Sequence, residues 1–123
     1  MPGSSQVFVG AVVAYDDQVK RELLAVPGQL IAAHGAVSEE VVRAMADGAQ
    51  QRFATDAALA VTGIAGPAGG TANKPVGTVW LAAKFGSEVR ALKRIFPGDR
   101  NEIRARAAQA GVDLLRRLLS GVQ

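Results

Sequence analysis

The sequence predicts one α/β domain over residues 1–123, and three observations carry this prediction. The length of 123 residues fits a single domain, and hydrophobic residues make up 49% of the chain, enough for a substantial core. Apolar runs bounded by turn residues predict buried strands. Between these runs, segments with a polar cap and apolar residues at helical spacing predict amphipathic helices.

The first predicted elements are a strand and a helix that meet at a corner. Residues 7–14, VFVGAVVA, are almost entirely apolar and predict a central strand buried on both faces. Asp16 and Asp17 are typical of the cap of a following helix. Tyr15 and Lys20 leave the same corner, and strand ends are where α/β folds place chemistry. A surface lysine near a helix start explains Lys20 equally well.

Two more helices are predicted before the next strand. Pro27 suits the first position of a short helix through residue 33. His34 and Gly35 are typical of its end, where Gly35 would take the left-handed cap and His34 would interact with the helix dipole. Such a histidine is more often a cap than a catalyst. Ser38 then caps a longer helix.

The most informative stretch is a glycine-dense loop that joins two predicted strands. The first strand is an apolar run over residues 57–61, and a second apolar run, 76–85, restarts the sheet. Four glycines fall within eight positions between them: Gly63, Gly66, Gly69 and Gly70. Glycine lets a backbone approach a ligand closely, and N–H groups in such loops form concave anion sites. A solvent loop without a role is the alternative.

Two known phosphate motifs do not fit this loop. A Walker loop needs Gly-Lys-Ser or Gly-Lys-Thr entering a helix, whereas Lys74 precedes Pro75 and a strand follows. The G-x-G-x-x-G spacing of dinucleotide sites is also absent. The residues alone therefore indicate a small polar or phosphorylated ligand without identifying it.

The C-terminal part predicts a hairpin and a long helix. Residues 77–85 and 88–96 are separated by a glycine-serine turn, and alternation in the second run indicates an outer strand. Asp99 and Glu102 then have the spacing of a capping box that opens the last helix. In its first turn, the basic residues Arg100 and Arg104 oppose the helix dipole unless an anion is near. They suit a phosphate, although two solvated arginines explain them as well.

Composition excludes several classes of site. Cysteine is absent, which rules out a disulfide, a zinc thiolate site and a cysteine nucleophile, and a single histidine argues against a histidine-based metal site. No run of 18 apolar residues predicts a membrane span, and the N-terminus lacks the features of a signal peptide. A cytoplasmic protein without metal is therefore expected.

The charge distribution argues against nucleic-acid binding. Residues 88–117 carry eight Lys or Arg and four Asp or Glu, a net charge of +4, so the rest nets −1 within the total of +3. This basic block lacks interleaved aromatic residues and any nucleic-acid motif. A solvated helix face is the simpler explanation.

Six short stretches together resemble the C-terminal domain of the competence/damage-inducible CinA proteins, which also occurs alone as nicotinamide mononucleotide deamidase. They are PGSS at 2–5, VVAY at 12–15 with Lys20, HGAVSEEV at 34–41, TGIAGPAGG at 62–70, KPVGTVW at 74–80 and FPGDR at 96–100. The stretches occur in family order and cover essentially the whole chain. The resemblance implies a three-layer α/β/α fold with a mixed sheet.

The resemblance also implies an activity. The family hydrolyses the carboxamide of nicotinamide mononucleotide to nicotinic acid mononucleotide and ammonia, in pyridine nucleotide salvage and without a cofactor. It attacks the amide with a serine that nearby lysine and tyrosine activate. On this chain the resemblance makes Lys20 the base and Tyr15 its assistant. The implied substrate-binding residues are Thr62, Gly63, Gly66, Gly69, Gly70, Thr71, Thr78, Arg100 and Arg104.

One departure from the family concerns the nucleophile. The family's serine belongs to an A-E-S-C-T-G-G-like motif on a helix before PGSS, and this chain starts at MPGSS. The chain as written is therefore expected to lack its nucleophile and the helix that covers one sheet face. A start codon assigned too late, a degenerate paralogue and a fragment of a longer CinA each explain this, and the complete look of the remainder favours the first.

Other functions stay open at this point. A non-catalytic nucleotide-binding module or subunit of a CinA-like protein is the main alternative, supported by the missing serine. A structural or DNA-associated role is a third, and salt-dependent DNA affinity would be its signature. An exposed sheet is compatible with a homodimer, but the sequence shows no interface.

Overall fold

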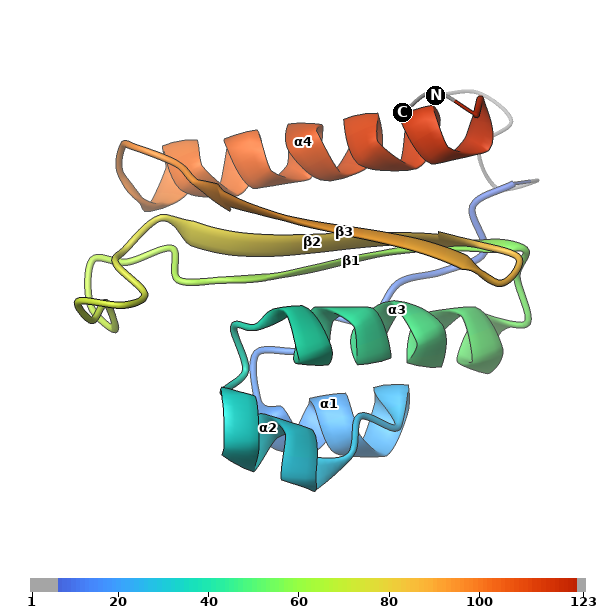
Figure 1. Ribbon diagram of the computed structural model, residues 1–123, viewed down its shortest axis with the longest axis horizontal. Coiled ribbons are helices and arrows are strands. Elements are labelled where there is room, and N and C mark those ends of the chain that lie inside the picture. Colours follow the sequence, from blue (N-terminus) through green and yellow to red (C-terminus); the bar gives the residue numbers. More distant parts are fainter. Residues whose placement is uncertain (1–6, 122–123) are drawn as a thin grey trace.

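The computed structural model describes residues 7–121 and arranges them in three layers (Figure 1). The middle layer is a sheet of β1 (Ala57–Gly63), β2 (Thr78–Phe85) and β3 (Glu88–Ile95). One face is covered by α4 (Arg100–Leu119) and the other by α3 (Glu39–Phe53), with α1 (Asp17–Leu24) and α2 (Gly28–His34) packed against α3. The predicted α/β class and its three layers are thus confirmed. The PGSS stretch at 2–5 lies outside the described residues.

The sheet is antiparallel throughout, in the order β1-β2-β3. β2 pairs with β1 on one side, with Leu59 opposite Ala83, and with β3 on the other, with Leu81 opposite Leu92. The β2–β3 pair is the predicted hairpin. The mixed sheet implied by the family resemblance is not found among the described residues, because no parallel strand joins these three.

The strand predicted over residues 7–14 does not form, so that prediction is wrong. No strand forms there; Val7 is 81% exposed and Val13 is 72% exposed. Val12 and Ala14 pack against the core beside α3, while nothing in the described part of the chain covers the opposite side. A continuous apolar run indicates burial on both faces only where a layer of structure lies on each face.

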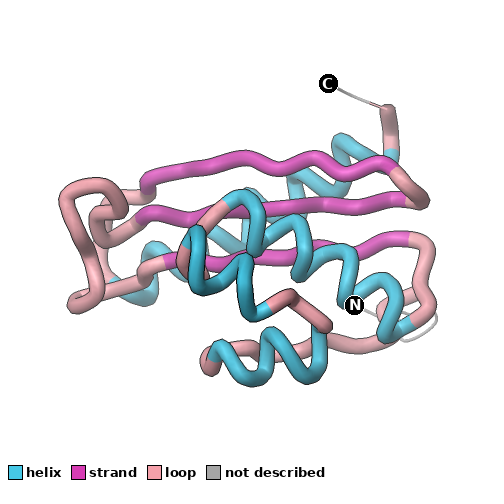
Figure 2. The backbone as a smooth tube through the Cα atoms, turned by 60° about the horizontal axis from the view of Figure 1, so that its bottom comes forward, coloured by secondary structure: helices cyan, strands magenta, loops and turns pink. Residues whose placement is uncertain are grey.

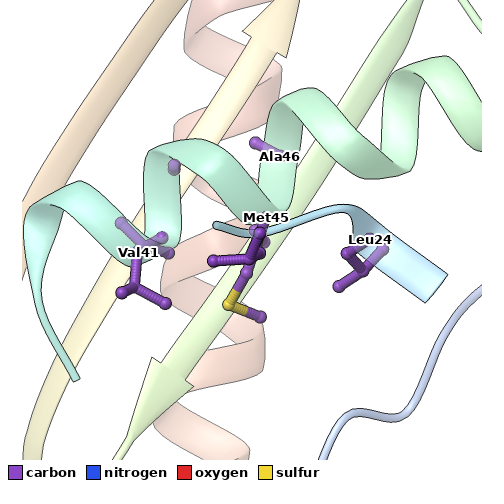
Figure 3. Packing of buried hydrophobic residues seen from close by; sticks show 8 residues of the cluster. Leu24, Val41, Met45 and Ala46 are labelled. Atoms are coloured by element: carbon purple, nitrogen blue, oxygen red, sulfur yellow. The ribbon is translucent and has the colours of Figure 1, made fainter. Parts of the chain in front are cut away.

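Two apolar clusters hold the layers together, one on each face of the sheet. The cluster around α3 joins that helix to the sheet and to α1, and consists of Leu24, Val26, Val41, Val42, Met45, Ala46, Ala60 and Ala82 (Figure 3). Beneath α4 lie Val79, Leu81, Ala83, Ile103, Ala107, Leu114 and Leu118. Because neighbouring residues of β2 enter opposite clusters, this strand is buried on both faces. None of the helices in residues 7–121 combines the length and apolar character that crossing a membrane requires.

The helix caps follow the sequence closely. Asp16 accepts a hydrogen bond from the Gln18 N–H at 2.7 Å, and Ser38 accepts one from Val41 at 3.3 Å. Asp99 opens α4 in the predicted capping box. Only α2 differs: it begins at Gly28, after Pro27, and its C-cap glycine has a positive φ but an extended ψ instead of the left-handed helical value.

A polar contact also joins the sheet to α3. The Lys84 ammonium on β2 donates a hydrogen bond to the Asp47 carboxylate on α3, which lowers the pKa of Asp47. A lowered carboxyl pKa contributes stability that is present above the usual value of about 3.9 and is lost as pH falls below it. The Asp47 side chain is half exposed, so solvent screening keeps this contribution small.

The crossing of α1 over α3 gives a test of the packing. A Cβ added to Gly48 would overlap the backbone carbonyl of Leu24, whereas one added to Gly111 would lie 3.2 Å from a movable Leu59 methyl. Gly→Ala in a helix interior gains about 1 kcal/mol of propensity. We expect Gly48→Ala nevertheless to lower the free energy of unfolding by about 1–3 kcal/mol, since overpacking outweighs that gain. Gly111→Ala is the control and should change it by less than about 1 kcal/mol; equal urea midpoints for both variants would contradict the crossing.

Candidate functional site

The glycine-dense loop between β1 and β2 is ordered by its own backbone. At its base, the Ile64 N–H donates to the Thr78 carbonyl at 2.9 Å, and the Gly77 N–H donates to the Ile64 carbonyl at 2.7 Å. At its tip, the Thr71 N–H donates to the Lys74 carbonyl at 2.9 Å. The loop is therefore a folded structure that leaves the end of the sheet.

The glycines of the loop allow close packing as well as unusual dihedrals. Gly66 and Gly69 have φ values of +80° and +95°, in the region that favours glycine. A Cβ on Gly70 would lie 2.7 Å from the Val76 backbone nitrogen, and one on Gly63 would lie 2.9 Å from a Val79 methyl. Packing against the start of β2 thus accounts for part of the glycine content that the sequence suggested was there for a ligand.

Two cationic side chains tie the loop to the helices around it. Arg100, in the first turn of α4, donates to the Gly66 carbonyl at 3.1 Å. Lys74 reaches across to the end of α2 and donates to the His34 carbonyl at 2.8 Å. Arg104 is exposed and has no hydrogen bond or ion pair within residues 7–121. Of the two arginines singled out from the sequence, only Arg100 therefore meets the loop.

The threonines around the loop divide into two buried residues and one exposed residue. The Thr62 hydroxyl donates to the Ala36 carbonyl at 2.9 Å and ties β1 to the segment before α3. Thr78 is fully buried and donates to the Pro75 carbonyl at 2.6 Å. These two hydroxyls are engaged in building the site. Thr71 is the threonine that faces solvent, where it accepts a hydrogen bond from the Lys74 N–H at 3.1 Å.

Lys20 is the buried cation of this end of the molecule. The residue is 5% exposed, and its Nζ donates to the Ala14 carbonyl at 2.9 Å and lies 3.6 Å from the Asp17 carboxylate. Lysine is rarely buried to this extent without a partner or a role. Tyr15, in contrast, is 73% exposed. The two residues leave the same corner, as predicted, but point into different surroundings.

These parts gather toward one end of the fold. The glycine loop, the start of α3, the start of α4 and the end of α2 lie at the left end of Figure 1, and α1 begins on that side as well. Figure 2 shows the loop at the same end. Helix N-termini and loop N–H groups are donors for anions, so this end suits a ligand with negative charge. No group of three or more metal-binding side chains occurs among residues 7–121.

Comparison with known proteins identifies the family. The model of the CinA C-terminal domain matches residues 1–119. The chain belongs to this family. A CinA-like protein of Gemmatimonas aurantiaca is 56% identical over 117 residues, 95% of this chain and 27% of that protein. A CinA-like protein of Mycobacterium tuberculosis is 51% identical over 122 residues, 98% of this chain and 28% of that protein.

Solved structures of the family have the same fold. A competence/damage-inducible protein from Agrobacterium tumefaciens matches with a TM-score of 0.83 and 40% identity, over 86% of this chain and 66% of that one. A competence/damage-inducible protein A from Klebsiella pneumoniae matches with a TM-score of 0.85 and 37% identity, over 91% of this chain and 70% of that one. The chain therefore spans a little over a quarter of the curated relatives named above and about two thirds of these solved chains.

Two contacts of this CinA domain escaped prediction because they join residues far apart in the chain. The spacing around Lys74 is informative only about the Walker motif, whereas its bond to the His34 carbonyl spans 40 positions. Gly77, outside the group of four glycines, has a φ of +97°, and a Cβ there would overlap the Phe96 carbonyl. The sequence singled out Lys74 and Gly77 only as members of the KPVGTVW stretch, which does not indicate their contacts.

The Arg100 contact predicts a measurable effect on loop order. Arg100→Ala removes the bond to the Gly66 carbonyl, so we expect amide hydrogen exchange in residues 64–76 to accelerate by about five- to tenfold, in line with the loss of one hydrogen bond that contributes about 1 kcal/mol. Arg104→Ala is the matched control, one turn further along α4, and should leave these rates unchanged. Unaltered exchange in Arg100→Ala would show that the contact does not order the loop.

Proposed function

We propose that this CinA domain hydrolyses the carboxamide of nicotinamide mononucleotide, releasing ammonia and nicotinic acid mononucleotide. The observation that carries the proposal is the buried Lys20, whose Nζ is fixed 2.9 Å from the Ala14 carbonyl at the corner where α1 begins. Family membership supports the proposal, while the relatives' names state no activity. The folded glycine loop lies toward the same end (Figure 1), and we assign the binding of the anionic nucleotide to it.

In this proposal Lys20 acts as the general base. A neutral amine keeps two N–H groups and one lone pair, so the bond to Ala14 can persist while the lone pair accepts a proton. A serine hydroxyl gives its proton to Lys20 as its oxygen attacks the carboxamide carbon. The proton then passes to the amide nitrogen, the C–N bond breaks and ammonia leaves. Water hydrolyses the resulting acyl-enzyme ester by the same proton route.

The proposal assigns nucleotide binding to the loop and its neighbours. Backbone N–H groups of residues 63–70 and the exposed Thr71 hydroxyl would contact the phosphate and ribose. Arg100 would act mainly by holding the loop through Gly66, and its charge would favour the phosphate. Arg104 has no competing partner among residues 7–121 and would reach the phosphate from the exposed side of α4. The exposed Tyr15 would assist the proton transfer or orient Lys20.

The attacking serine is the element that the proposal places outside the described residues. Ser38 is occupied as a cap: its hydroxyl donates to the Gly35 carbonyl at 2.8 Å and accepts from Val41. The family resemblance assigns the nucleophile to a helix upstream of PGSS. Because Ser38 is occupied as a cap, a second candidate function is favoured for the 123 residues by themselves. That function is nucleotide binding without turnover.

Ammonia release tests both candidates. The 123-residue chain and a form extended upstream by the family's serine-bearing helix would each be incubated with nicotinamide mononucleotide. We expect turnover from the extended form, and Lys20→Ala in that form should lower kcat by at least about 100-fold, the usual scale of a lost general base. Arg21→Ala is the control, since Arg21 is an exposed neighbour on the same helix.

The other outcomes separate the proposals. If the 123-residue chain also releases ammonia, the nucleophile is not the upstream serine. If neither form is active but the nucleotide binds, the domain is a binding module. Near-normal kcat in Lys20→Ala would remove Lys20 from the mechanism.

A further inference from the structure

The free edge of the sheet carries a second candidate binding surface, away from the glycine loop. β3 is the outermost strand, at the top of the sheet in Figure 2. A groove of about 590 Å³ follows this edge between the two helical layers. We call it the β3 groove, and the lining residues that matter here are Arg43, Arg90, Leu92, Arg94, Asp113 and Arg117.

The backbone along the β3 groove has no strand partner within residues 7–121. The Phe96 N–H donates to the Gly77 carbonyl at 2.9 Å, so the backbone N–H of Phe96 is directed toward the β2 side of β3. Bonding alternates along an antiparallel strand, so Leu92 faces β2 whereas Ala91 and Lys93 direct their N–H and C=O groups outward. Such a row of outward groups is a template for an added strand.

The charge of the β3 groove is positive although several of its arginines have partners. Arg43 pairs with Glu39 at 2.9 Å, and Arg117 pairs with Asp113 at 2.9 Å. Arg94 donates a hydrogen bond to the Lys93 carbonyl at 3.1 Å. Because a carbonyl is neutral, this bond does not neutralise the positive charge of Arg94. Among the charged residues that line the groove and their ion-pair partners, five are cationic and three are anionic: Arg43, Arg90, Arg94, Arg116 and Arg117 against Glu39, Glu88 and Asp113.

The same charges disfavour pairing between two copies of this chain. In an antiparallel pair of β3 edges centred on Leu92, Arg90 of one copy would lie directly opposite Arg94 of the other. Like charges in directly opposed positions destabilise a strand pair. A homodimer in that register is therefore disfavoured, and the positive charge of the edge is complementary to an acidic occupant.

We propose that the β3 groove binds an extended acidic segment of a partner protein as a fourth strand. Main-chain hydrogen bonds to the outward groups of Ala91 and Lys93 would supply affinity. Side chains of an added strand alternate between faces, so acidic residues at every second position would meet Arg90 and Arg94, which share a face with Leu92. Nucleic acid fits less well, since no aromatic side chain lines the groove for base stacking.

A labelled peptide provides the probe. It has about eight residues and alternates glutamate with threonine or valine, and a matched peptide carries glutamine in place of glutamate. We expect the fluorescence anisotropy of the acidic peptide to saturate as protein is added. The glutamine peptide should bind with an affinity at least about tenfold lower, because charge pairing is lost. Amide chemical shifts of the labelled protein should move in Glu88–Ile95.

Variants separate charge from strand addition. Arg94→Gln should lower the affinity for the acidic peptide by about tenfold. Arg52 is exposed at the end of α3, and the control Arg52→Gln should leave the affinity unchanged. Lys93→Pro removes an outward N–H without removing a bond to β2, and edge strands tolerate such a proline. It should abolish binding, whereas Lys93→Gln should only weaken it. If Lys93→Pro proves unfolded by circular dichroism, the amide shifts of the unsubstituted protein decide the matter.

Several results would overturn the proposal. These are an absence of binding at millimolar peptide, equal binding of the two peptides, shifts confined to other elements, or equal binding by Arg94→Gln and Arg52→Gln. Tighter binding of a single-stranded oligonucleotide that competes with the peptide would assign the groove to nucleic acid instead.

Discussion

The structure depends on burying one strand, β2, on both of its faces. Leu81, Ala82 and Ala83 have no exposed surface, and successive residues enter the α4 cluster and the α3 cluster in turn. Burial of apolar surface at about 25 cal/mol per Å² is the main favourable contribution to holding both helical layers on the sheet. The strand also begins at the base of the glycine loop. Anything that loosens β2 therefore loosens the candidate site.

This dependence explains why the candidate site combines rigid and exposed parts. Thr78 at the start of β2 is fully buried, and Thr62 fixes the end of β1 to the segment before α3. Arg100 and Lys74 then anchor the loop to two different helices. Binding residues on loops that are positioned by a rigid scaffold are a common solution in proteins. Residues 67–73 at the tip of the loop, Thr71 among them, stay exposed at the surface.

Local signals in the sequence predicted most helices and strands, but they could not predict contacts between residues far apart in the chain. Asp16, Ser38 and Asp99 mark helix starts through bonds to residues two or three positions away, so they can be recognised from spacing alone. The strand predicted over residues 7–14 did not form. Apolar character indicates only a tendency to be buried, while burial itself requires a layer of structure on each face of the segment. At the site, the corner of Lys20 and the loop were predictable, but the Arg100 contact with Gly66 spans 34 positions and requires the fold.

Mapping of nicotinamide mononucleotide on the isotope-labelled 123-residue chain is the most direct test of the central claim, that the end of the sheet with the glycine loop is a nucleotide site. The account predicts saturable amide shifts in residues 63–76 and in α1 around Lys20, because ligand and loop would share hydrogen bonds there. Nicotinamide without the phosphoribose should shift the loop less, since it lacks the anion. Saturable shifts confined to other surfaces, or none at millimolar nucleotide, would contradict the account.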